Sequence, residues 1–321
     1  MSNEDTNNDI LLYDIILLQC LYLGRIHFHH SYCTPMIALW LFVAFLSLSF
    51  VVSTTSGFSM QSNNEAAFAF ATTPKAIVFD IDGTLADSWK LGYEATQVVL
   101  KNNGIPLIDE VTYHECTKFS TPQRLARHAG LEPMTFAASG DEIEQKAKSI
   151  ETNNALFERT GQKLAAEFDE LYVGLVANET AGLFPGIRGV LERIISCPST
   201  VVKMGCLTNA CVAYAHAVLE VNDDSDLCLV KHCLSVHGAD TVPAAKPEPD
   251  GLYQVCDELG VAPCDAVYVG DSPSDALAAH AAGMSSIGVT WGSHSEESLK
   301  KAPFDVYVST PDELCRMLRL P

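Results

Sequence analysis

Basic residues are scarce in this chain. Its 321 residues include 20 Lys and Arg but 40 Asp and Glu, which gives a formal net charge of −20. In residues 1–74, Arg25 is the sole Lys or Arg. Nucleic acids are bound through patches of Lys and Arg, so this composition argues against a nucleic-acid-binding protein. An acidic enzyme can still act on phosphate esters where a Lys and a metal ion supply positive charge locally.

The chain also has no Cys-x-x-Cys pair, and its eleven cysteines are an odd number. Cys206, Cys228, Cys256 and Cys264 lie in or beside apolar runs. This pattern is typical of buried free thiols in a reducing compartment, and no second half of a zinc site is evident. We therefore assign no metal to the cysteines. Hydrophobic residues make up 48% of the chain, which is enough for a sizeable core.

The segment before residue 75 does not follow the pattern of a folded domain. Residues 36–52 form an apolar run of 17 residues without a charge. Such a run is marginal for a bilayer core about 30 Å thick and long for the apolar part of a signal peptide. Because residues 66–74 are similar to the Ala-Phe cleavage motif of algal bipartite plastid presequences, we expect residues 1–74 to be an organellar presequence, with the plastid as favoured destination. The alternatives are a membrane anchor at residues 36–52 or, if translation starts further along the chain, a cytoplasmic protein.

From residue 75 onward, short apolar runs alternate with segments in which apolar residues have helical spacing. We expect strands at residues 75–81, 201–207, 227–234, 266–269, 286–290 and 305–308. We expect helices at residues 88–103, 121–128, 140–175, 187–195, 210–221, 244–259, 274–282 and 311–318. This alternation predicts an α/β fold with a parallel, doubly wound sheet. Strand signals are few between residues 105 and 180, which indicates a long helical insert after the first strand.

The first strand ends in the sequence Asp80-Ile81-Asp82-Gly83-Thr84. The carboxyl ends of parallel strands form the ligand-binding edge of an open α/β sheet. Two close carboxylates at such an end repel each other unless a cation or a proton lies between them. Read alone, the pattern also suits a loop with two solvated Asp residues, but residues after the later strands favour a functional site.

This stretch resembles motif I, D-x-D-G-T, of the haloacid-dehalogenase-like (HAD) hydrolases. Later positions match the family's other motifs in order: Thr208 after the second strand, Lys246 in Lys-Pro-Glu-Pro-Asp, and Gly270-Asp271 followed by Asp275. The resemblance runs from about residue 75 to the C-terminus. Within the family, the pattern is similar to the phosphoglycolate-phosphatase-like group, which acts on small phosphate monoesters.

The resemblance implies how the chain is divided. A Rossmann-like α/β core would consist of residues 75–90 and 185–321. An α-helical cap of the C1 type, residues 91–184, would be inserted into this core and lie over the active site. Residues 1–74 would not be part of the fold.

The resemblance also implies a role for each polar residue of the first motif. Asp80 matches the nucleophile, whose carboxylate attacks phosphorus and forms an aspartyl-phosphate. Asp82 matches the general acid/base, which protonates the leaving oxygen and then activates water. Haloacid dehalogenases do not carry this second Asp, so its presence favours phosphoryl transfer. Gly83 would allow the tight turn and Thr84 would fix it, both beside the bound substrate.

The later motifs supply the remaining groups. Thr208 would donate its hydroxyl to a phosphoryl oxygen, although the same residue suits the N-cap of the helix that follows. Asn209 would bind the same oxygens. Lys246 would neutralise both the nucleophile and the phosphoryl group, whereas a lysine without this context would be read as solvated.

Mg²⁺ is the implied cofactor. It is a hard cation that prefers carboxylate oxygens and waters. The implied ligands are the carboxylates of Asp80 and Asp271 and the backbone carbonyl of Asp82. Asp275 is expected behind these ligands, as a partner of Lys246 or as an acid in the first turn of a helix.

The cap is expected to choose the substrate. Arg124, or Arg127 beside it, can grip a carboxylate or a second phosphate through two hydrogen bonds, although either suits a solvated helix face. The predicted activity is Mg²⁺-dependent hydrolysis of small phosphate monoesters, with a small phosphorylated metabolite as partner. One alternative is a phosphomutase of the β-phosphoglucomutase type, which usually has Glu-Asp where this chain has Gly270-Asp271. The other is a non-catalytic binding protein with the HAD fold. No oligomeric state is predicted.

Overall fold

The computed structural model describes residues 73–134, 143–196 and 202–320. The apolar run at residues 36–52, predicted to belong to a presequence or a membrane anchor, lies outside these residues. Within the described ranges, no helix is both long and apolar enough to cross a membrane.

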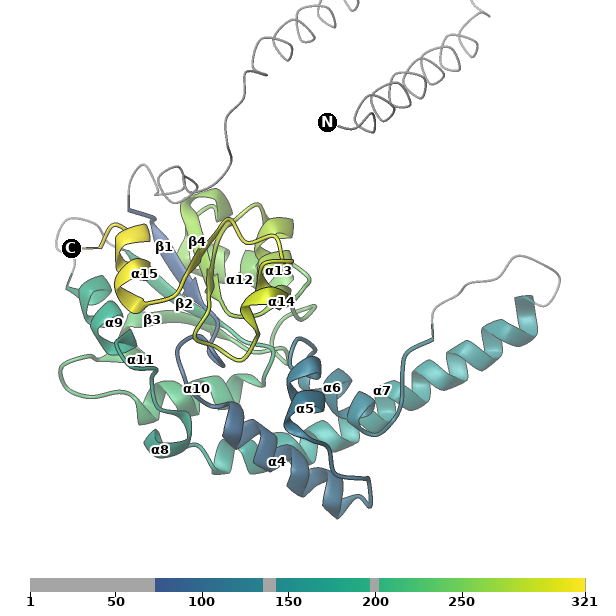
Figure 1. Ribbon diagram of the computed structural model, residues 1–321. Coiled ribbons are helices and arrows are strands. Elements are labelled where there is room, and N and C mark those ends of the chain that lie inside the picture. Colours follow the sequence, from purple (N-terminus) through teal and green to yellow (C-terminus); the bar gives the residue numbers. More distant parts are fainter. Residues whose placement is uncertain (1–72, 135–142, 197–201, 321) are drawn as a thin grey trace, which may run out of the picture. The chain divides into compact units, whose positions relative to one another are not determined.

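The fold is organised around a parallel sheet, which in the described part of the chain has six strands in the order β3-β2-β1-β4-β5-β6 (Figure 1). The strands are β1 (Ala76–Phe79), β2 (Lys203–Leu207), β3 (Cys233–His237), β4 (Ala266–Gly270), β5 (Ser285–Val289) and β6 (Val306–Val308). β1 lies between β2 and β4, and all of its residues are buried. The strand order reverses at β1, so ligands are expected at the carboxyl end of this strand.

Helices cover both faces of the sheet. Those after the first half of the chain are α9 (Ile187–Ile195), α10 (Val212–Val221), α11 (Leu229–His232), α12 (Asp250–Leu259), the 3-10 turn η2 (Pro263–Asp265), α13 (Pro273–Ala282), α14 (Glu296–Leu299) and α15 (Pro311–Met317). Ile77 and Phe79 pack into one hydrophobic cluster with α9, α10 and α15. Ala76 and Val78 pack into another with α12 and α13. Successive residues of β1 thus face opposite helical layers, and the predicted doubly wound α/β fold is confirmed.

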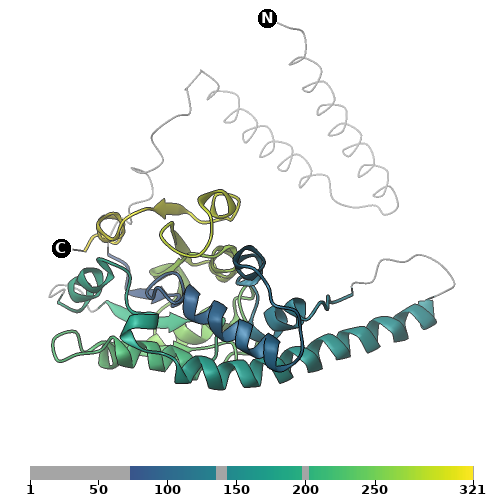
Figure 2. The same ribbon diagram turned by 60° about the horizontal axis from the view of Figure 1, so that its bottom comes forward.

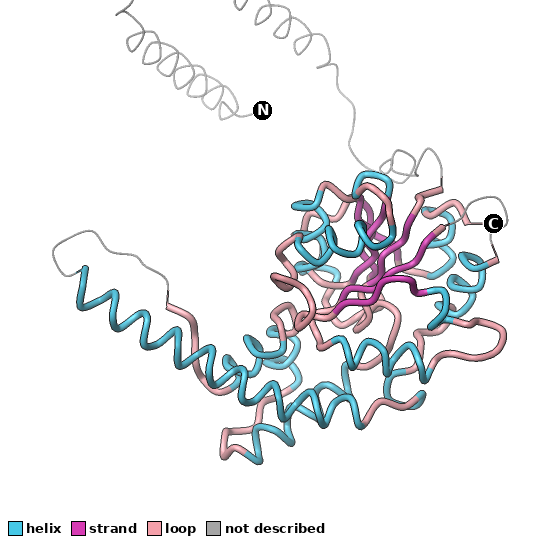
Figure 3. Tube along the Cα trace, turned by 180° about the vertical axis from the view of Figure 1, so that it is seen from behind, coloured by secondary structure: helices cyan, strands magenta, loops and turns pink. Residues whose placement is uncertain are grey.

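The chain between β1 and β2 is helical. It forms α4 (Trp89–Asn102), α5 (Glu110–Cys116), α6 (Thr121–His128), α7 (Ile143–Gly174) and α8 (Asn178–Ala181) before α9. α4 and α6 pack against the long helix α7, and these helices lie together beyond one end of the sheet (Figures 1 and 2). Seen from behind, the strands run side by side toward them (Figure 3). The predicted helical cap is therefore present, and we keep its boundaries at residues 91 and 184 as a proposal.

One face of α7 connects the cap to the core. Leu164, Phe168 and Tyr172 are buried and follow one another at a spacing of four residues, so they lie on the same side of the helix. The Tyr172 ring stacks on the ring of Tyr214 in α10, with 4.1 Å between the ring centroids. The C-terminal part of α7 thereby lies against the core, close to the carboxyl end of β1.

The strand predicted at residues 227–234 is wrong. The chain forms the short helix α11 there, and β3 begins only at Cys233. Asp224 Oδ1 accepts the backbone N–H of Leu227 at 2.9 Å and thereby fixes a turn before the helix. Leu227 and Leu229 are buried in the core from this turn and helix. A short apolar run indicates burial, but periodicity alone does not separate a strand from a helical turn.

Candidate active site

The carboxyl ends of the strands bring the predicted residues together. Asp80 and Asp82 follow β1, Thr208 follows β2, Asp271 follows β4, and Lys246 comes from the loop between β3 and α12. All five line one cavity with a volume of about 80 Å³. One water needs roughly 10–15 Å³ of such volume, so the cavity suits a ligand of a few heavy atoms.

A tight turn after β1 places Asp82 and leaves room for Asp271. The three backbone N–H groups of residues 84–86 all donate to the carbonyl of Ile81. Gly83 has a φ of +75°, and a Cβ at this position would collide with the Asp271 carboxylate. Gly83 is therefore required twice, by the backbone conformation of the turn and by the space that Asp271 occupies.

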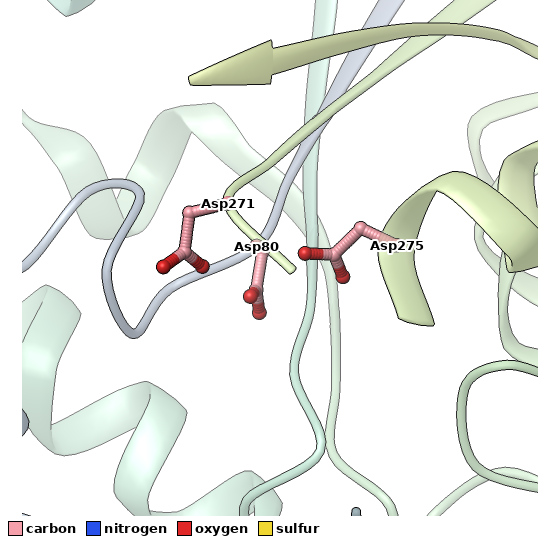
Figure 4. Close-up of side chains that lie close together, drawn as sticks. All are labelled: Asp80, Asp271 and Asp275. Atoms are coloured by element: carbon pink, nitrogen blue, oxygen red, sulfur yellow. The ribbon is translucent and has the colours of Figure 1, made fainter. Parts of the chain in front are cut away.

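Three buried carboxylates lie close together at the carboxyl ends of the strands. Asp80, Asp271 and Asp275 each offer one oxygen, and these oxygens lie within 4.8 Å of one another (Figure 4). Burial, followed by the charge of Asp275, raises the pKa of Asp80 well above its usual value. The same two causes raise the pKa of Asp271 to about 7. Such shifts arise where carboxylates are crowded without enough positive charge.

Lys246 is the cation of this group. Its Nζ lies 2.9 Å from Asp80 Oδ1 and 2.7 Å from Asp275 Oδ1, and it donates to the Tyr268 hydroxyl at 2.9 Å. Burial lowers the pKa of this ammonium, but the charges of Asp275 and Asp80 outweigh burial and leave the pKa raised. Lys246 is therefore charged, and it supplies one positive charge to a group of three carboxyl side chains.

The carboxylate oxygens of this group are suited to bind a magnesium ion. Asp80 Oδ1 is buried, and among the described residues its contact is the 2.9 Å ion pair with the Lys246 ammonium. Asp271 accepts a hydrogen bond from the backbone N–H of Ser293 at 2.7 Å. Asp275 is more fully engaged, because its two oxygens accept from Lys246 and from the backbone N–H of Ser272. Hard carboxylate oxygens with free lone pairs suit Mg²⁺, so Asp80 and Asp271 would hold the ion while Asp275 positions Lys246.

Residues 77–289 match the family model of the haloacid dehalogenase-like hydrolases. The chain belongs to this family. Proteins named phosphoglycolate phosphatase are among the relatives of the hydrolase. That of Escherichia coli strain K12 is 28% identical over 249 residues, which cover 77% of this chain and 93% of the relative. That of Xanthomonas campestris pv. campestris strain 8004 is 28% identical over 242 residues, which cover 75% of this chain and 95% of the relative.

Solved structures share the fold of the hydrolase. CbbY from Rhodobacter sphaeroides, in complex with phosphate, has a TM-score of 0.58 at 22% identity and covers 77% of this chain and 100% of its own. β-Phosphoglucomutase from Clostridium difficile has a TM-score of 0.54 at 21% identity and covers 75% of this chain and 93% of its own. These two likenesses concern the fold alone. The predictions of the family, of a likeness to phosphoglycolate phosphatases and of an enzyme are confirmed by the family match and the relatives.

The Asp82 side chain does not join the three carboxylates of the hydrolase. Its Oδ2 lies 3.3 Å from Thr208 Oγ1, and Thr208 Oγ1 also accepts the backbone N–H of Ala210. Thr208 thus faces the site and supports the chain before α10 at the same time. The Asn209 side chain makes two hydrogen bonds of 3.0 Å with the backbone of Lys246 and so holds the Lys246 loop against the end of β2.

Some predicted assignments have no direct counterpart in this geometry. Gly83 packs on Asp271, and Thr84 is buried with a hydroxyl that has no hydrogen-bond partner among the described residues. Neither residue lines the cavity. Their contact with substrate, the contact of Asn209 with phosphoryl oxygens, and ligation of Mg²⁺ by the Asp82 backbone all stay predictions.

The two candidate arginines of the cap differ in their surroundings. Arg124 is 6% exposed and lines the cavity, and its partners are the Thr96 hydroxyl at 2.9 Å and the face of the Phe168 ring. No carboxylate of the described residues forms an ion pair with it. Arg127 pairs with Glu132 at 3.2 Å and does not line this cavity. A buried cation without a carboxylate is costly, so Arg124 is suited to an anionic ligand.

Sequence reasoning missed the loop after β5. The Trp291 indole N–H donates to a backbone carbonyl of the turn after β1 at 3.1 Å, and Ser293 supplies the N–H that binds Asp271. A Cβ on Gly292 would collide with Asp271, and His294 lines the cavity. Residues 291–294 directly follow a predicted strand, and this position at a strand end could have indicated that they lie at the site.

Removal of metal is expected to destabilise the hydrolase more at high pH. The pKa of Asp271 is raised from its ordinary value of 3.8 to about 7 in the folded chain. Its contribution therefore favours folding below pH 4 and is lost as the pH rises through 7. Mg²⁺ binds the ionised carboxylates, so saturating Mg²⁺ should raise the melting temperature by roughly 5–10 °C at pH 8 and by less at pH 5. Thermal melts in Mg²⁺ and in EDTA measure this, and an equal Mg²⁺ effect at both pH values would contradict it.

Proposed function

We propose that the protein hydrolyses small phosphate monoesters with the help of Mg²⁺ and through an aspartyl-phosphate on Asp80. The phosphoglycolate phosphatases among its relatives support a phosphatase. The observation that carries the proposal is the shared cavity. A buried carboxylate at a strand end, a second carboxylate two residues later, a hydroxyl and a buried ammonium face the same small space.

The reaction needs two displacements at phosphorus. In the first, an Asp80 oxygen bonds to phosphorus, the bond from phosphorus to the leaving oxygen breaks, and Asp82 gives a proton to that oxygen. In the second, a water oxygen bonds to phosphorus and gives a proton to Asp82, the bond to Asp80 breaks, and inorganic phosphate leaves. Asp82 suits both proton transfers because one of its oxygens faces Thr208 at the cavity.

Positive charge at the phosphoryl group would come from both the ion and the chain. Mg²⁺, held by Asp80 and Asp271, would supply positive charge to the phosphoryl oxygens and neutralise part of the carboxylate group. Lys246, held by Asp275 and Tyr268, keeps an ammonium beside the Asp80 carboxylate. The Thr208 hydroxyl can turn from Asp82 to a phosphoryl oxygen, since its present contact is 3.3 Å long.

The substrate is a small ester with a second anionic group. The cavity of about 80 Å³ suits a small ester, and Arg124 brings to it a guanidinium without a carboxylate partner among the described residues. A carboxylate or second phosphate on the substrate would form charge-assisted hydrogen bonds with this group. Phosphoglycolate, the substrate in the relatives' name, has this chemistry.

The proposal is tested by phosphate release from the full-length chain. Phosphoglycolate, other small phosphate monoesters and a nucleotide monophosphate are supplied in turn, with Mg²⁺ or with EDTA. We expect release that requires Mg²⁺ and is fastest for a small ester with a second anionic group. A folded protein that releases no phosphate from any ester would overturn the proposal.

Replacing Arg124 with Met should weaken binding selectively. Met keeps an apolar side chain beside the Phe168 ring, while the charge-assisted hydrogen bonds to the second anion are lost. We expect KM for phosphoglycolate to rise about tenfold to a hundredfold, whereas KM for ethyl phosphate should stay nearly constant. Arg127→Met is the matched control, because Arg127 already pairs with Glu132, and it should leave both KM values within about twofold. An equal rise for both esters would show that Arg124 does not read the second anion.

The phosphomutase alternative meets a steric obstacle. A Cβ on Gly270 would collide with the Asp275 carboxylate. The Glu usual at this position in that type of mutase therefore has no room while Asp275 holds Lys246. The pairing of Gly270 with Asp275 supports hydrolysis, and conversion of β-glucose 1-phosphate to glucose 6-phosphate by the full-length chain would contradict it.

A further inference from the structure

Three hydroxyl groups converge on one oxygen of Asp82. Ser88 Oγ donates to Oδ1 at 2.6 Å. The hydroxyls of Tyr214 and Tyr172 donate to the same oxygen at 2.6 Å and 2.9 Å. The other oxygen, Oδ2, has one hydrogen-bond contact among the described residues, the 3.3 Å distance to Thr208 Oγ1. A carboxylate oxygen has two lone pairs, so three donors leave Oδ1 no capacity to take a proton.

The two tyrosines are held by their rings. Tyr172 comes from cap helix α7 and Tyr214 from core helix α10, and both are nearly fully buried. Their rings stack with 15° between the planes, and the Phe168 ring also packs against Tyr172, with 4.7 Å between centroids. This aromatic stack (Phe168, Tyr172 and Tyr214) fixes where the two hydroxyls point.

Both tyrosines remain donors under ordinary conditions. Burial, and then the charge of Asp82, raises the pKa of each phenol well above its usual value. Neither phenol therefore serves as a base at neutral pH. Their effect on the reaction must pass through the carboxylate they bind.

We propose that Tyr172 and Tyr214 are positioning residues that hold Asp82 by Oδ1, so that Oδ2 is the oxygen that exchanges protons with the substrate and with water. This inference rests on the proposed role of Asp82. The proton leaves Oδ2 for the leaving oxygen as that oxygen takes the electron pair of the broken bond to phosphorus. A proton of the attacking water later returns to Oδ2 as the water oxygen bonds to phosphorus and the bond to Asp80 breaks.

The test compares two leaving groups in the full-length protein with Mg²⁺. An alkoxide, as from phosphoglycolate, needs a proton to depart, whereas nitrophenolate from 4-nitrophenyl phosphate does not. In Tyr214→Phe and in Tyr172→Phe, kcat/KM for phosphoglycolate should fall about tenfold, a fraction of the full general-acid contribution. For 4-nitrophenyl phosphate, kcat/KM should stay within about twofold. A burst of nitrophenolate should appear, because hydrolysis of the aspartyl-phosphate becomes rate-limiting.

Tyr307→Phe is the control, because it removes a half-buried tyrosine hydroxyl that donates to Leu299 and Ala302 carbonyls instead. It should change neither ester. An equal fall for both esters in the Tyr172 and Tyr214 variants would overturn the inference, since a purely structural role affects both alike. No fall in either variant would overturn it too. If Tyr214→Phe does not fold, Tyr172→Phe from the cap decides. Failure of the proposed function would be distinguished from failure of this inference, because the unaltered protein would then release no phosphate from either ester.

Discussion

Asp80→Asn is expected to reduce Mg²⁺-dependent phosphate release by roughly 10⁴ to 10⁶-fold, the loss seen when an enzyme's nucleophile is removed. The amide is a poor nucleophile and a poor ligand for Mg²⁺. Steady-state phosphate release, with phosphoglycolate as substrate, measures the loss. Asp87→Asn makes the same change at an exposed residue seven positions along the chain and should leave the rate within about twofold.

The same variant should not lose stability in EDTA. Asp80 lies in a group of three buried carboxylates with one lysine, and the Asp275 charge helps to raise its pKa. An amide removes that repulsion, and Lys246 keeps its 2.7 Å ion pair with Asp275. We therefore expect an inactive protein that melts in EDTA at or above the temperature of the unaltered chain, and that gains less from Mg²⁺. Low activity together with a lowered melting temperature would point to misfolding instead.

The centre of the site could be predicted because strand ends fix where residues meet. Asp80, Thr208, Lys246 and Asp271 each stand at or soon after a predicted strand, and the carboxyl ends of parallel strands share one edge of the sheet. Together with the resemblance to the family motifs, these positions predicted that the residues would meet. The wrong bounds of the strand predicted at residues 227–234 did not affect the placement of Lys246, because the Lys246 loop follows both the predicted strand and the observed β3.

The residues around Asp82 could not be predicted in this way. Tyr172 and Tyr214 stand on helices with apolar residues at helical spacing, which is the ordinary pattern of a packed helix face. Nothing in their local sequence separates a ring that only fills space from one whose hydroxyl reaches a carboxylate. Their meeting depends on how α7 lies across α10, which is a matter of tertiary packing.

A similar limit applies to the choice between Arg124 and Arg127. Both lie on α6 and are three residues apart, so residue type and position in the sequence do not show which of them meets the substrate. The distinction comes from Glu132 after the helix, which pairs with Arg127, and from the aromatic ring beneath Arg124. Charge compensation in space, rather than residue type, identifies the arginine that is suited to an anion.

Lys246→Met is expected to be the most destabilising single change at the site. The Nζ of Lys246 contacts carboxylates of Asp80 and Asp275, and all three residues are buried. Removal of one partner of a buried ion pair leaves uncompensated charge, at a cost of about 3–5 kcal/mol. For a domain of this size, that corresponds to a fall in melting temperature of roughly 10 °C in EDTA.

Adding Mg²⁺ distinguishes the loss of stability in Lys246→Met from its loss of activity. Bound Mg²⁺ restores positive charge beside the carboxylates, so it should recover part of the lost stability of Lys246→Met. It should not restore the rate, which we expect to be about 10²- to 10³-fold lower because a preorganised cation at the transferring phosphoryl group is missing. Lys301→Met is the control, since its 2.9 Å pair with Glu297 is exposed and contributes about 0.3–0.5 kcal/mol. A Lys246→Met protein that melts in EDTA like the control would contradict a stabilising role for the Lys246 ion pairs.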